Sequence, residues 1–61
     1  MGSFAEFIVA GTRTRIFINV ELVRAVEPGR HENSTQIVFD GQHYVSVVGR
    51  LEDVIEKIQN A

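Results

Sequence analysis

The chain contains no cysteine and no tryptophan, and only one proline, among its 61 residues. Without cysteine it forms no disulfide, and a cysteine-based zinc site is excluded as well. The two histidines, His31 and His43, are too few for a typical structural zinc site. Small domains usually gain stability from disulfides, a metal or a second subunit, so association between copies is the remaining route.

Long apolar runs are also missing, so we expect no segment that crosses a membrane. The first residues lack the basic region and the long apolar core of a signal peptide. We therefore expect a soluble, cytoplasmic protein. The net charge is −2 and the isoelectric point is about 5.5, which is not the basic balance typical of nucleic-acid binders.

The size of the chain predicts one domain, residues 1–61. A chain this short buries only about 60% of the surface that its unfolded form exposes, so it is marginally stable alone. Apolar residues nevertheless make up 44% of the sequence. This excess predicts a homo-oligomer, most simply a twofold dimer.

The first half of the chain shows the alternation that is typical of strands. Strands are predicted over residues 4–10 and 13–20, with a turn at Gly11-Thr12 between them. The second strand places Ile16, Ile18 and Val20 on one face. Its other face carries both Arg15 and Phe17, so that face is either partly exposed to solvent or in contact with a partner.

The middle of the chain predicts a capped turn, a strand and a loop. Asn19 is placed to cap a short turn over residues 20–22. A third strand over residues 23–27 ends at the breaker pair Pro28-Gly29. The positions after this pair are all polar, so residues 28–34 are expected to form an exposed loop.

The strongest local signal is Asp40-Gly41, which lies between the alternating stretches 35–39 and 42–48. It is typical of a β-hairpin with a two-residue type I′ turn, which needs positive φ at both turn positions. This turn places Ile37 opposite Tyr44. Both faces of the hairpin then carry bulky apolar side chains, so one face needs cover from outside the chain.

The last segment predicts a short amphipathic helix from Gly49 or Arg50 to about Gln59. Its apolar residues follow the spacing of one buried stripe: Leu51, Val54, Ile55 and Ile58. The predicted fold is therefore α+β: a small antiparallel sheet of four to five strands with one C-terminal helix packed on one face. A second subunit is expected to cover the other face.

No motif in the sequence points to catalysis. The serines have no histidine or aspartate partner at a recognisable spacing, and no glycine-rich loop that would hold a phosphate is present. The acidic residues near the C-terminus are explained as the solvated surface of the helix. We therefore expect a protein that is not an enzyme, with no catalytic, metal-binding or cofactor-binding residues and no cofactor.

Four residues are candidates for contacts with nucleic acid or with a partner: Arg13, Arg15, Arg24 and His43. Arg13 and Arg15 are expected on the same strand face, and Arg24 is expected to join them across the sheet. With Phe17 or Tyr44 nearby, such a face would grip phosphates and stack a base. The alternative is a solubilising strand face with no ligand.

His43 falls within a predicted strand, opposite Val38. One interpretation is a pH-sensitive or ligand-contacting imidazole, because histidine changes its charge near neutral pH. The other interpretation is a partly buried residue of the sheet.

Three segments carry a resemblance to a known family: INVELVRAVEP (18–28), TQIVFDGQHYVSV (35–47) and LEDVIEKI (51–58). They resemble the small flagellar and swarming proteins of the FlbD/SwrD family, which implies a bacterial, non-enzymatic protein linked to motility. The polar loop and the N-terminal strand are longer here than that family pattern needs. The strand, hairpin and helix also resemble the C-terminal portion of LytTR-type DNA-binding domains, which are longer than this chain.

Two functions follow from the sequence. The first is a non-catalytic binding or adaptor protein that acts as a homo-oligomer on a protein partner. The alternative is a nucleic-acid-binding regulator that uses the arginine-bearing strand face.

Overall fold

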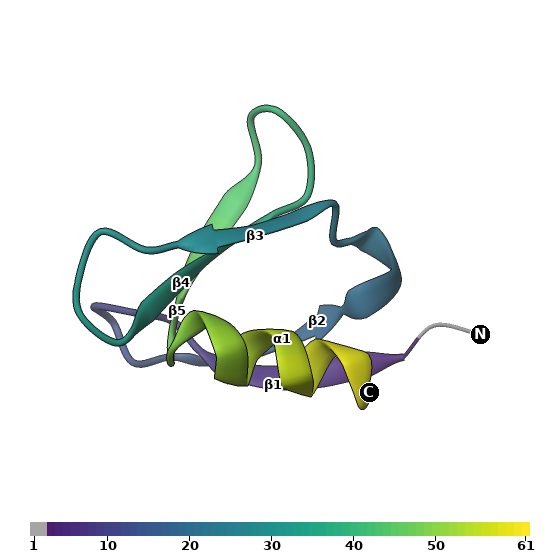
Figure 1. Cartoon of the computed structure of the whole chain (residues 1–61), viewed down its shortest axis with the longest axis horizontal. Helices are drawn as coiled ribbons and strands as arrows, with labels where there is room; N and C mark the ends of the chain where they lie inside the picture. Colours follow the sequence, from purple (N-terminus) through teal and green to yellow (C-terminus); the bar gives the residue numbers. More distant parts are fainter. Residues whose placement is uncertain (1–2) are drawn as a thin grey trace.

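The computed structural model describes residues 3–61, which form five strands, one 3-10 helix and one α-helix. The strands are β1 (Phe4–Ile8), β2 (Arg15–Asn19), β3 (Ala25–Pro28), β4 (Ser34–Val38) and β5 (Tyr44–Val48). The 3-10 helix η1 (Val20–Leu22) joins β2 to β3, and the α-helix α1 (Leu51–Gln59) follows β5 (Figure 1). The predicted α+β fold with antiparallel strands and a C-terminal helix is confirmed.

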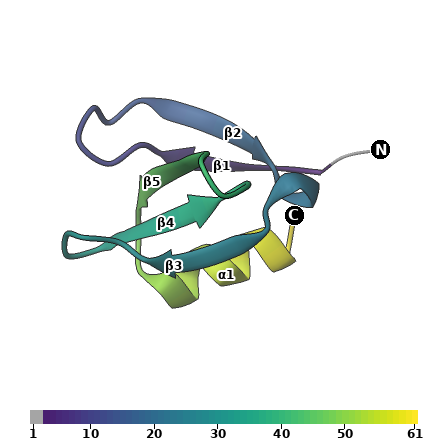
Figure 2. The same cartoon turned by 90° about the horizontal axis from the view of Figure 1, so that it is seen from above.

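The five strands divide into two antiparallel sheets, whereas the sequence predicted one. β1 pairs with β2, and β3, β4 and β5 form the second sheet in that order (Figure 2). The two sheets are linked by a bridge between Val9 and Val47, beside which the Ala10 N–H donates to the Ser46 carbonyl at 2.9 Å. η1 turns the chain away from β2, so the consecutive strands β2 and β3 lie in different sheets.

The core lies between the inner faces of the two sheets and α1. It consists of six buried apolar side chains: Ala5, Phe7, Ile18, Ile37, Val47 and Val54. Ala5 pairs with Ile18 across β1 and β2, which fixes the inner face of that sheet. Phe17 is 60% exposed on the outer face, as the alternation predicted.

The β1–β2 connection is a wider turn than Gly11-Thr12 alone. The Val9 N–H donates to the Thr14 carbonyl at 2.8 Å, and the Arg13 N–H donates to the Val9 carbonyl at 2.9 Å. Arg13 has φ 62° within this turn, so β2 begins at Arg15 rather than at residue 13.

The capped turn after β2 is confirmed. The Asn19 Oδ1 accepts the Glu21 N–H at 3.0 Å and so satisfies a donor at the start of η1. β3 is an outer strand and includes Pro28, which has no N–H to donate and is tolerated at a sheet edge.

The β4–β5 hairpin is confirmed, but its predicted register is wrong by one residue. Val38 lies opposite Tyr44, and Ile37 lies opposite Val45 rather than Tyr44. Positive φ occurs at Gly11, Arg13, Asn33 and Gly49, but not at Asp40 or Gly41, so the type I′ turn is not formed. Because side chains alternate along a strand, the shift places Tyr44 on the outer face, where it is 59% exposed.

α1 begins at Leu51 and ends at Gln59, close to the predicted bounds. Val54 is buried, but Ile55 at the edge of the predicted stripe remains 37% exposed. The Lys57 Nζ donates to the Glu6 carbonyl of β1 and lies 4.9 Å from the centre of the Phe7 ring. One flank of α1 therefore lies against β1, and the flank with Ile55, about 200° around the helix, is turned away from it.

Candidate functional site

The three candidate arginines do not form one face. Arg13 lies in the β1–β2 turn, Arg15 opens β2 on its outer face, and Arg24 follows η1 in the connection to β3. The prediction that Arg13 and Arg15 share a strand face is wrong, because Arg13 belongs to the turn. Arg24 does not join them across a sheet, because its neighbouring strand β3 belongs to the other sheet.

Arg15 is also occupied by a partner on its own sheet. Its Nε lies 3.1 Å from the Glu6 Oε2, and its guanidinium carbon lies 6.0 Å from the centre of the Phe17 ring. Both side chains of the ion pair are solvent-accessible, so the pair contributes little to stability. It does neutralise the positive charge that a phosphate contact would need.

His43 lies in the β4–β5 loop rather than in a strand, and it is exposed rather than partly buried. The Phe39 N–H donates to the His43 carbonyl at 2.9 Å, so His43 faces Phe39 instead of Val38. The His43 Nδ1 lies 2.9 Å from each carboxylate oxygen of Asp40.

Asp40 is the centre of this loop. Its Oδ1 accepts the N–H groups of Gln42 at 2.8 Å and His43 at 2.9 Å, as aspartate does when its side chain closes a turn. The hydrogen bond from the Gln42 N–H, with the contacts of His43, holds the pKa of the Asp40 carboxyl below its usual value. The sequence analysis missed this role of Asp40. Its signal is an aspartate at the start of a loop, where its carboxylate can accept the backbone N–H of the residue two positions later.

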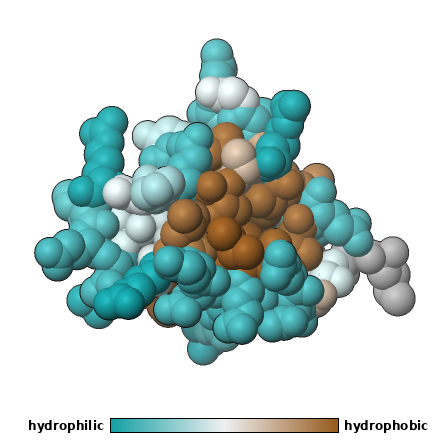
Figure 3. All heavy atoms as spheres, in the orientation of Figure 1, coloured by the Kyte–Doolittle hydropathy of each residue, from teal (hydrophilic) through white to brown (hydrophobic). Residues whose placement is uncertain are grey.

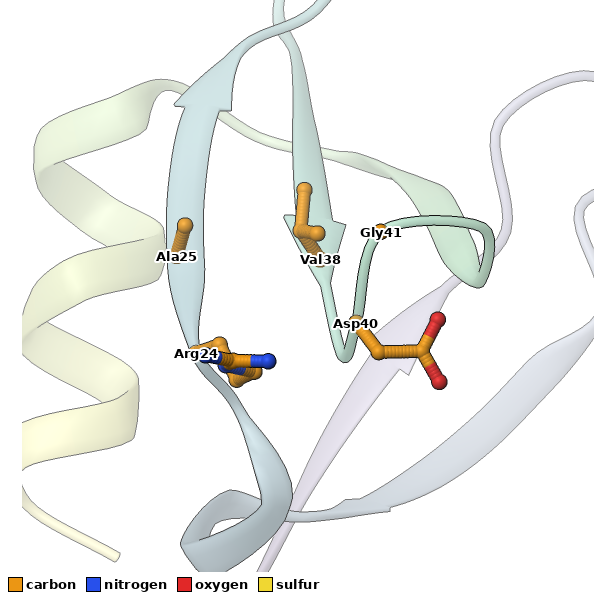
Figure 4. Close-up of a pocket in the computed structure, with 5 residues that line it drawn as sticks. All are labelled: Arg24, Ala25, Val38, Asp40 and Gly41. Atoms are coloured by element: carbon orange, nitrogen blue, oxygen red, sulfur yellow. The ribbon is translucent and has the colours of Figure 1, made fainter.

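A shallow pocket of about 390 Å³ lies between β3 and the loop held by Asp40. It is lined by Arg24, Ala25, Val38, Asp40 and Gly41. Figure 4 shows Arg24 and Asp40 on opposite sides of it, with the Asp40 carboxylate turned away from Arg24. The Arg24 N–H donates to the Val38 carbonyl at 2.9 Å, which holds its backbone against the end of β4.

Apolar surface gathers between β3 and α1, ringed by polar side chains (Figure 3). We use the name apolar strip for six exposed or half-buried apolar residues of α1, of β3, with which α1 is in contact, and of the segment that leads into β3: Leu22, Val23, Val26, Leu51, Ile55 and Ile58. Leu22 is 63% exposed and Ile55 is 37% exposed, and the other four are half-buried. The strip exists because the single helix leaves part of the core uncovered on its β3 flank.

Other large apolar side chains are exposed on the outer faces of both sheets. Phe4 and Phe17 lie on the outer face of β1 and β2, and Tyr44 and Val48 lie on the outer face of β5. Polar neighbours interrupt them, since Phe4 faces Asn19 and Phe17 faces Glu6 across the strands.

No group of three histidine, aspartate or glutamate side chains in residues 3–61 is arranged to hold a metal ion. Across the same described residues, no helix has the length and apolar character needed to span a bilayer.

In comparisons with protein-family models, with curated proteins and with solved structures, nothing matches the chain. The resemblance to the FlbD/SwrD family, the link to motility and the cytoplasmic location therefore stay predictions. Nucleic-acid binding also stays a prediction, and the scattered arginines of the described chain give it no assembled basic face.

Proposed function

We propose that the protein is a non-catalytic binding module that works as a homodimer, with the apolar strips of two copies packed against each other. The observation that carries the proposal is the exposure of Leu22 and Ile55 beside half-buried neighbours in one strip. A contiguous exposed apolar area rimmed by polar residues is typical of an interaction surface.

A second copy suits this strip for two reasons. In a twofold dimer the same surface of each copy packs against itself, so like charges on it would repel each other. The six residues of the strip are all uncharged, so they cause no such repulsion. A chain this small, without a disulfide, also benefits from the core that a partner copy completes.

The energetics favour a reversible dimer. Fully burying one large apolar side chain contributes about 1.5–3 kcal/mol, and Leu22 (63% exposed) and Ile55 (37% exposed) together still expose about one side chain per copy, so the dimer gains about 3–6 kcal/mol from them. The loss of translational and rotational freedom on association costs about 4–15 kcal/mol. Because the two quantities are comparable, we expect an equilibrium between monomer and dimer that depends on protein concentration.

Light scattering across a concentration series tests the proposal. The unmodified chain is expected to approach the dimer mass at high micromolar concentration, and Ile55→Glu and Leu22→Ser are expected to remain monomeric. Tyr44→Ser is the matched control, because it removes from the outer face of β5 a large side chain that is about as exposed as Leu22. Circular dichroism of each variant confirms that it is folded.

A chain that stays monomeric throughout the series contradicts the proposal. Dimerisation that survives Ile55→Glu and Leu22→Ser but is lost in Tyr44→Ser would place the interface on the other side of the second sheet.

A further inference from the structure

The pocket at the end of β3 has a cationic side and an apolar floor. Ala25 and Val38 are paired across β3 and β4, and their side chains lie on the face opposite Val26 and the buried Ile37. The floor is therefore on the side of the second sheet that is turned away from α1. Its volume of about 390 Å³ is within the range of sites that hold small molecules.

The positive charge of Arg24 is not compensated within the described chain. The ion pairs among residues 3–61 join Arg15 to Glu6 and His43 to Asp40, and neither includes Arg24. Asp40 is the acidic residue of the pocket wall, but its carboxylate accepts hydrogen bonds from Gln42 and His43 and is turned away from Arg24 (Figure 4). Arg24 therefore has donors free for an acceptor from outside.

The surroundings of the pocket favour a ligand with an apolar body. Tyr44 lies directly opposite Val38 on the same outer face and is 59% exposed, so it extends the apolar floor sideways. At Gly41 no atom lies within 4 Å of the place where a Cβ would stand, so the rim is open at the loop.

We infer that this pocket binds a carboxylate carried on a small apolar or aromatic body. The Arg24 guanidinium donates to the carboxylate oxygens, and the body lies on Ala25 and Val38 beside the Tyr44 ring. A single arginine matches a singly charged carboxylate, and the nearby negative charge of Asp40 disfavours a doubly charged phosphate. The ligand occupies the outer face, so its binding is independent of the apolar strip and of dimerisation.

The same chemistry is available from a free small carboxylate and from an acidic residue beside an aromatic one in a peptide. Amide chemical shifts of the whole chain, followed by NMR during titration, distinguish these sources. The first probe is phenylacetate, with the neutral phenylacetamide as its matched control. The second probe is acetyl-Phe-Glu-amide, with acetyl-Phe-Gln-amide as its control.

Binding is expected to shift the amide signals of Ala25, Val38 and Gly41 with phenylacetate or with the glutamate peptide, and not with the neutral control. Arg24→Gln is expected to raise the dissociation constant at least about tenfold, because it removes the charge-assisted hydrogen bonds. Arg24→Lys keeps the charge without the planar fork and is expected to weaken binding less. Arg13→Gln removes an exposed arginine from the β1–β2 turn and is expected to leave the dissociation constant unchanged.

A larger effect from phenylacetate than from the peptide assigns a small-molecule site, and the reverse assigns a peptide site. Equal shifts with the charged and neutral probes, or an unchanged dissociation constant in Arg24→Gln, would overturn the inference. Because these titrations do not report mass, a failure here leaves the light-scattering test of the dimer unaffected.

Discussion

The Asp40 carboxylate and the His43 imidazole close the β4–β5 loop, with both Asp40 oxygens 2.9 Å from the His43 Nδ1. The same carboxylate accepts the backbone N–H groups of Gln42 and His43. One side chain thus satisfies two donors of a loop that lies outside the strand ladder. The loop that it closes joins Val38 to Tyr44, which face each other at the end of β4 and the start of β5.

Lowering the pH should remove the contribution of Asp40 to stability. Its pKa is lower in the folded chain than the ordinary value of 3.8, so its ionised form stabilises the fold fully above that value. This contribution is lost as the pH falls through the lowered pKa of the folded state. Urea denaturation at pH 6 and near pH 2.5 should show a smaller pH-dependent loss for Asp40→Asn than for the unmodified chain.

Glu32→Gln is the control for this experiment, since Glu32 is also an exposed carboxylate of a loop. Its pH-dependent loss of stability should match that of the unmodified chain. Equal losses in Asp40→Asn and the unmodified chain would show that the loop contact has no energetic weight.

Thr35→Val should destabilise the fold by about 1–3 kcal/mol despite its nearly equal volume. Thr35 is fully buried, and its Oγ1 donates to the Gly49 carbonyl at 2.8 Å. Valine leaves that part-buried carbonyl without its partner, which costs roughly this amount. Thr12→Val in the exposed turn should change the free energy of unfolding by less than about 0.5 kcal/mol, as measured by chemical denaturation.

Gly49→Ala should destabilise the fold by about 1–3 kcal/mol. Gly49 has φ 133°, a conformation that is strained for any residue with a Cβ, and the added carbon would lie 3.4 Å from the Val54 Cγ2. Gly41→Ala is the matched control, because Gly41 has no positive φ and its Cβ would meet open space. Similar thermal midpoints for the two variants would contradict this account of the β5–α1 connection.

Asn19→Ala should cost about 0.5–2 kcal/mol of stability, because it removes the side chain that accepts the Glu21 N–H. Asn19→Asp keeps an acceptor at the same place and should retain most of the stability. The comparison is made by chemical denaturation at neutral pH. A loss in Asn19→Asp as large as that in Asn19→Ala would mean that the cap does not hold η1.

The elements of this fold were predictable where local chemistry decides them. The alternation in residues 15–19, the capping oxygen of Asn19 and the helical spacing from Leu51 each specify a short segment on their own. The division into two sheets was not predictable in this way. Whether β2 pairs with β3 is a tertiary choice, and the bridge that links the two sheets joins Val9 to Val47, which are far apart in the sequence and carry no local signal for each other.

The hairpin register failed for a different reason. Asp-Gly favours a type I′ turn, but the aspartate carboxylate can instead accept the backbone N–H groups two and three residues later. The sequence does not show which of these two turns forms. The pairing of β4 with β5 is shifted by one position from the predicted register, so Tyr44 and Val45 lie on the faces opposite to those predicted. The pocket beside Arg24 could not be predicted, because Asp40 and Gly41 of this loop form part of its lining. The predicted arginine face failed for a separate reason, because Arg13 lies in the β1–β2 turn and not in a strand.

Pro28 on the outer strand β3 has a consequence for how copies of this protein meet. A proline interrupts the row of donors that another strand would need, so growth of a fibril from this edge is disfavoured. Association through side chains leaves open to water those amide protons of β3 that point away from β4, and their exchange with deuterium should stay fast when the protein associates.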